Sequence, residues 1–268
     1  MYFGIIKTFW KEAIAYRAEF MVSILVVPIR FLVLVMIWSA VYANTAGGSI
    51  RGYSLPDLIT YFILTTLMFI FIYDTVAEWL GDEVRSGNFL IFMLKPLSFM
   101  TISFYHKIAN RLFAVMAEIV PILIIFLLFF RQYLVMGHIG FFIISLLFAF
   151  VLSYLISLLI GMVAFWLVEI RSLSWLINFG LGLAAGQFAP LDLFPPVAQK
   201  IFSYLPFQYV TYVPVKIYLG GYTTDIASGF SGSVYSALAL QALWCGIIIV
   251  IALFVWRIAM KRFSGVGA

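Results

Sequence analysis

Residues 139–168 read IGFFIISLLFAFVLSYLISLLIGMVAFWLV and contain no Lys, Arg, Asp or Glu. A helix needs about 20 apolar residues to cross the hydrocarbon core of a bilayer. The strands of a membrane barrel would instead alternate in polarity over about 10 residues, and this run does not alternate. We therefore expect one membrane-spanning helix here, tilted or beginning outside the hydrocarbon because of its length.

The whole chain has the same apolar character. It has 268 residues, of which 65% are hydrophobic and 10% are charged. Soluble domains are roughly half apolar and about a quarter charged. A globule of this length cannot hide so much apolar surface, so lipid must solvate much of it. The sequence predicts an all-α integral membrane protein with a single transmembrane domain over residues 1–268.

Basic residues fix the orientation of the predicted spans. Eleven of the 16 Lys and Arg residues fall on one side, four on the other, and Arg30 lies within the first span. Because basic residues concentrate on the cytoplasmic side of membrane proteins, both termini are expected there. This topology explains the net charge of +5 without nucleic acid. We expect six spans: 20–43, 56–78, 108–130, 139–168, 173–189 and 235–256.

Residues 1–18 precede the first span. Phe3, Ile6 and Trp10 recur at helical spacing, apart from Lys7 and Lys11. This pattern is typical of an amphipathic helix lying in the membrane interface. An ordinary cytoplasmic stub is the alternative.

Residues 79–107 form the largest cytoplasmic segment. Asp82, Glu83 and Arg85 form a charge cluster, and Gly87 is a plausible helix stop. The segment suits either a solvated charged turn or a contact with another protein.

The outer connection, residues 190–234, is irregular. It holds five of the nine prolines but has long apolar stretches at Val197–Leu205 and Gln208–Leu219. An ordinary outer loop would be polar, so we expect two short helices that dip into the outer leaflet between spans five and six. Irregular backbone at that depth must be covered by protein or line a cavity.

Charges inside spans are costly and usually face protein or water. Arg30 and Glu118 each lie about ten residues into a span, at similar depth and with opposite sign, so we predict that they pair. Such a pair belongs either to a structural salt bridge or to an ion or substrate pathway. Gly182 and Gly186 have the spacing that lets two helices pack closely, although chance also produces it in a Gly- and Ala-rich helix.

Catalytic and metal-binding patterns are missing from the sequence. It has no G-x-x-x-x-G-K-[ST] loop for nucleotide phosphates. The topology puts His106 and His138 on opposite sides of the membrane, and Cys245 is the single cysteine. We expect no enzymatic activity, no metal and no cofactor bound by this chain.

Four stretches carry a family resemblance: EVRSGNF at 83–89 with LKPLS at 94–98, AFWLVE at 164–169, PLDLFP at 190–195, and LPF at 205–207. With them the chain resembles the permease subunits of bacterial type-2 ABC transporters, which work with a second permease and a separate ATPase.

The resemblance implies that the six spans form half of a dimeric channel. Asp82, Glu83, Arg85 and Gly87 would lie in a coupling helix seated on a cytoplasmic ABC ATPase, present in two copies, which would hold ATP and Mg. The region 190–219 would be a re-entrant outer gate, including Pro195, Pro196, Leu205, Pro206 and Phe207.

Three functions follow as hypotheses. The first is an ATP-driven exporter permease for a hydrophobic or amphiphilic substrate, such as a drug, lipid or peptide. The second is an ion-coupled secondary carrier that uses Glu118 and Asp74. The third is a membrane-embedded enzyme or scaffold, for which no catalytic cluster is found. The sequence leaves open whether the second permease is identical or homologous.

Overall fold

The computed structural model describes residues 17–45, 48–167, 171–222 and 232–262. Almost all of the predicted interfacial helix, residues 1–18, lies outside these ranges. The helices are α2 (Arg17–Ala43), α3 (Leu55–Ile72), α4 (Val76–Arg85), α5 (Phe89–Met93), α6 (Phe99–Ala114), α7 (Val120–Phe129), α8 (Ile139–Met162), α9 (Arg171–Ala184), α10 (Pro196–Ser203), α11 (Tyr212–Tyr218) and α12 (Val234–Arg262).

Short elements link these helices. A two-stranded antiparallel hairpin, β1 (Ser49–Ile50) and β2 (Tyr53–Ser54), joins α2 to α3. A π-helical turn, η1 (Val115–Ile119), joins α6 to α7. The remaining short helices are 3₁₀ turns: η2 (Arg131–Tyr133), η3 (Val163–Phe165), η4 (Leu191–Leu193) and η5 (Pro206–Tyr209).

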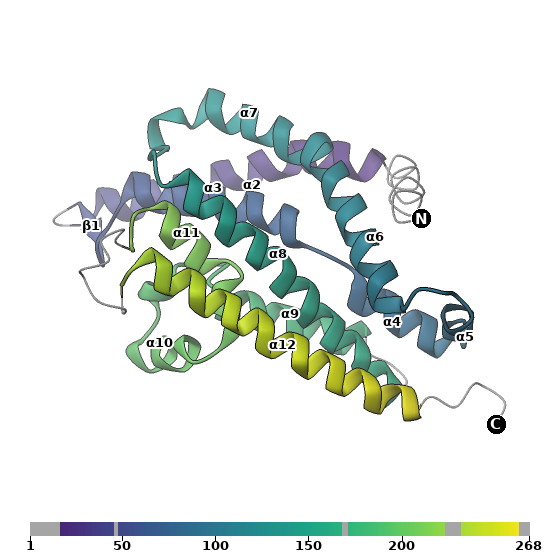
Figure 1. The fold of residues 1–268 in the computed structure, drawn as a ribbon. Coiled ribbons are helices and arrows are strands. Elements are labelled where there is room, and N and C mark those ends of the chain that lie inside the picture. The colour runs from purple at the N-terminus through teal and green to yellow at the C-terminus, as the bar shows by residue number, and fades with distance from the viewer. Residues whose placement is uncertain (1–16, 46–47, 168–170, 223–231, 263–268) are drawn as a thin grey trace.

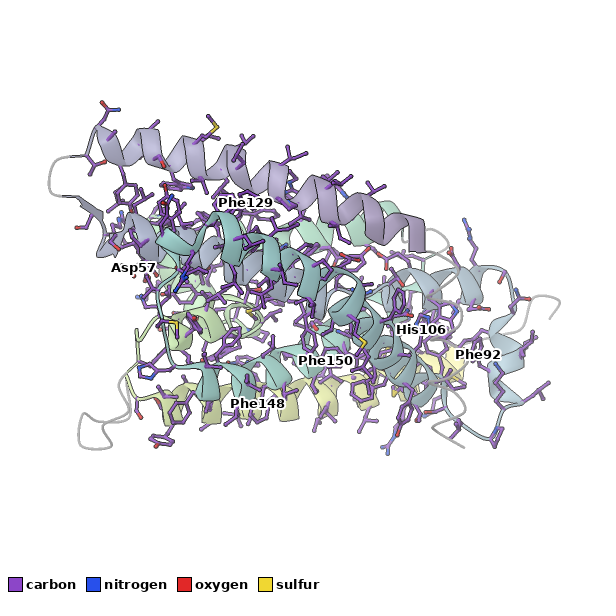
Figure 2. The ribbon with its side chains drawn as sticks, turned by 90° about the horizontal axis from the view of Figure 1, so that it is seen from above. Asp57, Phe92, His106, Phe129, Phe148 and Phe150 are labelled. Carbon is purple, nitrogen blue, oxygen red and sulfur yellow. The ribbon has the colours of Figure 1, made fainter. Side chains whose placement is uncertain are left out.

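The long helices run largely along one direction and give the molecule two ends (Figure 1). One end carries α4 and α5, together with the N-terminal end of α2 and the C-terminal end of α12. We call it the α4–α5 end. The opposite end carries β1, α10 and α11, and we call it the hairpin end. Asp57 of α3 and Phe92 of α5 mark these opposite ends in Figure 2.

Within the part of the chain that the structure describes, five helical segments are long and apolar enough to cross a membrane. Each overlaps one of the predicted spans, so the expected α-helical membrane protein is confirmed at this level. Their bounds are Ile24–Ala43, Leu55–Arg85, Phe99–Phe129, Ile139–Phe165 and Val234–Arg262.

The fifth predicted segment, 173–189, forms a shorter helix than expected. Helix α9 has 14 residues, Arg171–Ala184. At 1.5 Å per residue it is about 21 Å long, less than the hydrocarbon core of about 30 Å. Gly186 has φ +74°, a left-handed conformation that ends the helix and turns the chain. Helix α9 alone is therefore too short to cross.

The outward faces of the long helices are apolar. Soluble monomers rarely expose contiguous patches of this kind, so these faces suit lipid or other membrane helices. Side chains more than 60% exposed include Leu25, Ile29 and Met36 on α2, Leu128 and Phe129 on α7, and Val250 and Phe254 on α12.

The third span bends in its middle. Helices α6 and α7 meet at an angle in Figure 1, and η1 lies between them. A π-helical turn disrupts the regular i to i−4 hydrogen bonds, and Pro121 at the start of α7 donates none. The bend follows from these two local features.

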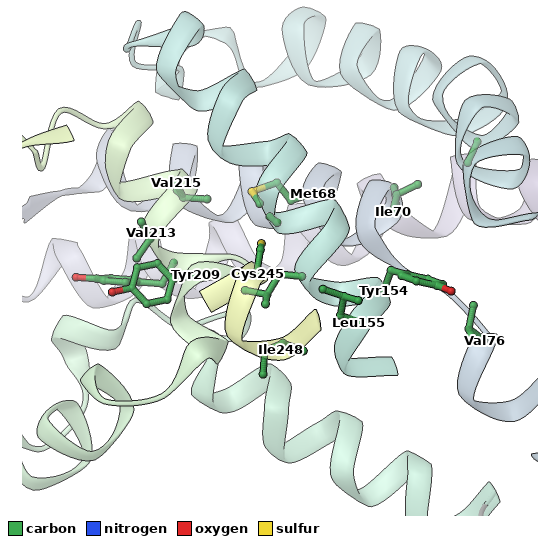
Figure 3. Packing of buried hydrophobic residues seen from close by; sticks show 14 of the residues in the cluster. Met68, Ile70, Val76, Tyr154, Leu155, Tyr209, Val213, Val215, Cys245 and Ile248 are labelled. Carbon is green, nitrogen blue, oxygen red and sulfur yellow. The ribbon is translucent and has the colours of Figure 1, made fainter. Parts of the chain in front are cut away.

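Helix α8 is the centre of the packing. It makes its most extensive contacts with α12 and α4, followed by α11. Figure 3 shows Tyr154 and Leu155 of α8 in the interior with Cys245 and Ile248 of α12. The buried Gln241 of α12 donates to the carbonyls of Ser145 (2.9 Å) and Tyr209 (2.8 Å). Polar bonds thus fix α12 against α8 and η5.

Gly161 lets α4 approach α8 closely. A Cβ atom there would lie 3.0 Å from the Cα of Ala77 and 3.2 Å from the Cβ of Leu80. Gly161→Leu should overpack this contact and lower the free energy of unfolding by about 1–3 kcal/mol. Thermal unfolding in detergent measures it. Gly140→Leu, on the same helix but with nothing within 4 Å, is the control; equal losses in both variants would contradict the close packing.

Candidate functional site

The predicted charge cluster lies on α4, at the α4–α5 end. Arg85 pairs with Asp82 at 3.4 Å, and both side chains are about half exposed, at 52% and 46%. Glu83 is engaged within the chain, because its carboxylate accepts from Trp79 Nε1 at 3.0 Å. Gly87 has φ +76° and turns the chain after α4, as the helix-stop pattern predicts. Asp82 and Arg85 are therefore the members of the cluster best placed to meet another protein.

A buried aromatic cluster holds α5 in place. The ring of Phe99 on α6 packs against the rings of Phe89 and Phe92, with centroids 6.0 Å and 5.1 Å apart. Trp79 of α4 lies 5.0 Å from the same ring, and Trp256 of α12 stacks on it at 6.3 Å. Phe89 and Phe92 are thus used inside the protein. The segment 88–94 does not offer them to a partner or to the membrane.

The opposite face of α5 is apolar and exposed. Leu94 is 88% exposed, and Leu90, Ile91 and Met93 are each about half exposed. Lys95 follows, with its ammonium 4.2 Å from the centre of the Phe92 ring. Together with Asp82 and Arg85, these side chains form a mixed apolar and charged surface, which we call the α4–α5 surface.

Asp192 organises the hairpin end. Its carboxylate accepts from Lys216 Nζ (2.6 Å), Tyr53 Oη (2.6 Å) and Tyr212 Oη (2.8 Å). Its backbone carbonyl accepts from Arg51 at 2.7 Å. One residue therefore ties the β1–β2 hairpin, η4 and α11 together.

The charge of Asp192 is stabilised by these bonds. Burial acts to raise the pKa of the Asp192 carboxyl, but hydrogen bonds from Lys216, Tyr53 and Tyr212 outweigh it. The pKa therefore lies below its ordinary value.

The two helices expected in the outer region are present, as α10 and α11. Pro195 and Pro196 are exposed at the start of α10, where proline is tolerated because no helical N–H is needed. Pro206 begins η5 and is buried, between the partly buried Leu205 and Phe207. Helix α11 is largely buried against α8 and α3, whereas α10 has no buried residue.

Gly182 and Gly186 allow close packing where α9 leads into the segment that carries α10 and α11. A Cβ atom at Gly182 would lie 2.9 Å from the Phe188 ring, just after α9. Gly186 lies beyond the helix, and its carbonyl accepts a hydrogen bond from Tyr61. The structure thus gives Gly186 a role in a turn, where the spacing had suggested helix–helix packing.

The two charges predicted to pair lie in different surroundings. Arg30 is on the exposed side of α2. Glu118 is partly buried in η1 and acts electrostatically on Arg111 of α6. A pairing of Arg30 with Glu118, within this chain or across a permease interface, stays a prediction.

Asp74 forms a buried ion pair with Lys107, the last residue of the predicted cytoplasmic segment 79–107. Lys107 Nζ lies 2.7 Å from Asp74 Oδ2, and their side chains are 0% and 5% exposed. Among the described residues, no group of three His, Cys, Asp or Glu side chains could hold a metal ion.

The sequence model of a family described as "ABC-2 family transporter protein" matches residues 28–267. The chain belongs to the ABC-2 transporter family. No curated protein matches it in a sequence search. As an ABC-2 permease it is a membrane transport component, and its family implies association with an ABC ATPase.

Two important residues of this ABC-2 permease escaped the sequence analysis. Asp192 is the one carboxylate between residues 190 and 219, an apolar stretch that also holds Lys200 and Lys216. Lys107 is the last residue of the predicted cytoplasmic segment 79–107. Matching each isolated charge with an opposite charge at similar predicted depth would have indicated both pairs.

The Asp192 cluster predicts acid sensitivity at the hairpin end. Because folding lowers the pKa of Asp192, its contribution to stability is present at neutral pH and is lost as pH falls below about 3.9. Thermal unfolding of the wild type should therefore weaken more steeply in acid than that of Asp192→Asn. Asp82→Asn, which removes an exposed carboxylate, should keep the wild-type slope. Identical acid slopes for wild type and Asp192→Asn would refute the role of this cluster.

Proposed function

We propose that this chain is the membrane-spanning subunit of an ATP-driven exporter in a bacterial inner membrane, with ATP and Mg bound by a separate cytoplasmic ABC ATPase. The ABC-2 family match over residues 28–267 carries the proposal. The absence of a phosphate-binding loop from the sequence supports placing ATP on another polypeptide.

The α4–α5 end is proposed to face the cytoplasm. The described ends of α2 and α12 lie at this end (Figure 1), as expected if both termini are on one side of the membrane. Arg85, Lys95, Lys261 and Arg262 are exposed on the elements that reach it. Excess positive charge marks the cytoplasmic side of membrane proteins.

The six-span topology is proposed with a composite fifth crossing. Helix α9 contacts both α4 and η5. The backbone N–H of Tyr212 donates to the carbonyl of Ala185, at 2.9 Å, which joins α11 to the end of α9. In this arrangement α9 crosses from the cytoplasmic side, and the re-entrant segment 190–219 fills the remaining depth as the outer gate.

The α4–α5 surface is proposed to couple the permease to the ATPase. It offers the exposed Asp82–Arg85 pair for charge-assisted bonds and the exposed apolar side of α5 for burial. Two ATPase copies and a second permease, identical or homologous, would complete the transporter. The exposed apolar faces of α2 and α9, including Trp175 and Leu176, suit a neighbouring permease or lipid.

The transported substrate is proposed to be hydrophobic or amphiphilic, of the drug, lipid or peptide kind. Support comes from the aliphatic and aromatic character of α2, α3 and α9. The alternative of an ion-coupled carrier is weakened by the structure, since Asp74 is engaged by Lys107 and Glu118 also has an interaction partner.

The coupling surface can be tested at its most exposed apolar side chain. Leu94→Asp should weaken binding of the purified ATPase to the nanodisc-embedded permease by at least about tenfold. The reason is that Leu94, exposed in the permease alone, would be buried by the bound ATPase, and the substitution puts a charge at that contact. Asp82→Ala combined with Arg85→Ala should also weaken binding while leaving the permease folded, since exposed pairs add little stability.

Met136→Asp is the matched control, because Met136 is 84% exposed but lies beyond α7, at the hairpin end. It should bind the ATPase as the wild type does. Normal binding by Leu94→Asp and by the Asp82 and Arg85 double variant would remove the α4–α5 surface from the coupling role.

A further inference from the structure

The second span is broken between α3 and α4. Tyr73 leaves the helix with φ −54° and ψ 142°, and helical structure resumes at Val76. Within a membrane such a break exposes backbone groups that lipid cannot satisfy. The break, residues 73–75, must therefore be stabilised by neighbouring parts of the protein.

Side chains from two other helices satisfy the backbone around the break. Arg111 of α6 donates to the carbonyl of Ile70 at 2.7 Å. The Ser153 hydroxyl of α8 lies 3.2 Å from the carbonyl of Ile72 and 3.0 Å from that of Phe150, and its one hydrogen is shared between these two acceptors. The Ala77 N–H donates to Ser157 Oγ at 3.2 Å. The ends of α3 and α4 are thus both hydrogen-bonded to their neighbours.

Asp74 and Lys107 lie at the centre of this arrangement. Asp74 Oδ1 accepts from the Val76 N–H at 3.2 Å and so caps α4, while Oδ2 accepts from Lys107 at 2.7 Å. Lys107 also donates to Ser153 Oγ (2.7 Å) and to the Phe150 carbonyl (3.3 Å). The pair therefore connects the start of α4 to α6 and α8.

This connection lies between parts that pack differently. Helix α4 packs mainly on α8, closely enough that Gly161 is needed, whereas α3 divides its contacts among α8, η2, α6 and η1. Helix α6 continues through η1 into α7, which reaches the hairpin end (Figure 1). A displacement of α4 must move Asp74, and a buried carboxylate cannot leave Lys107 without a large desolvation cost.

We propose that the Asp74–Lys107 pair is the joint through which movement of α4 is transmitted to α6 and onward to the hairpin end. Both are positioning residues for transport. The inference rests on the proposed function, because it takes the ATPase to act on α4. The inference gives the buried Asp74–Lys107 pair a role in transmitting movement, in addition to stabilising the fold.

The test separates transmission from stability with a neutral pair, Asp74→Asn with Lys107→Met. Asn keeps an acceptor for the Val76 N–H, and no uncompensated charge stays buried, so the variant should fold. The control is Tyr154→Phe, which removes the hydrogen bonds of the Tyr154 hydroxyl to Ser103 (3.0 Å) and to the Met100 carbonyl (2.6 Å) on α6. None of these groups bonds to the break.

The measurement is made on the permease–ATPase complex in nanodiscs, in a Cys245→Ala background. Spin labels at Asn44→Cys, at the end of α2, and Ser203→Cys, on α10, report the distance across the hairpin end. Binding of the ATPase and its ATP hydrolysis are measured on the same samples. The distance is recorded without nucleotide and with ATP and vanadate.

In the wild type and in Tyr154→Phe, nucleotide should shift the distance distribution. In the neutral pair the ATPase should bind and hydrolyse ATP normally, while the shifted population falls about tenfold, a loss within the range of couplings between sites. A normal shift in the neutral pair, or no shift in the wild type, would overturn the inference. Failure of the ATPase to bind the wild type would instead defeat the proposed function, and the inference with it.

Discussion

Lipid offers no hydrogen bonds, and this constraint explains where polar side chains lie in this protein. The long helices satisfy their own backbones, so their outward faces need only be apolar. Polar side chains gather where the helices are interrupted. At the break in span two, Arg111, Ser153 and Ser157 complete the backbone bonds. At the end of α9, the Tyr61 hydroxyl donates to the carbonyl of Gly186, and the backbone N–H of Tyr212 donates to that of Ala185.

The two ends of the bundle are built differently. At the α4–α5 end, aromatic rings around Phe99 hold α5 rigidly, so that its other face can stay exposed. At the hairpin end, Asp192 gathers Tyr53, Tyr212 and Lys216 into a polar cluster that fastens an irregular segment. Helix α8 runs between the two ends and packs against α4, α11 and α12.

The sequence predicted what depends on length and composition. Five of the six predicted spans, the stop of the charged helix before Gly87 and the two short helices between residues 190 and 219 follow from apolar runs, glycines and prolines. It did not predict what depends on tertiary partners. The break falls at residues 73–75, and its stability depends on side chains of α6 and α8, among them Arg111, Ser153 and Lys107. Likewise, the sequence spacing suggested a helix-packing role for Gly186. Its positive φ and the hydrogen bond that its carbonyl accepts from Tyr61 place it in a turn after α9.

The central claim is that the α4–α5 end faces the cytoplasm and the hairpin end faces outward. Single cysteines at Ser86 and at Ser203, in a Cys245→Ala background, test it most directly. In intact spheroplasts a membrane-impermeant maleimide should label the cysteine at 203 and not the one at 86, which should react only after the membrane is opened. Labelling at 86 from outside would contradict the orientation and, with it, the placement of the ATPase.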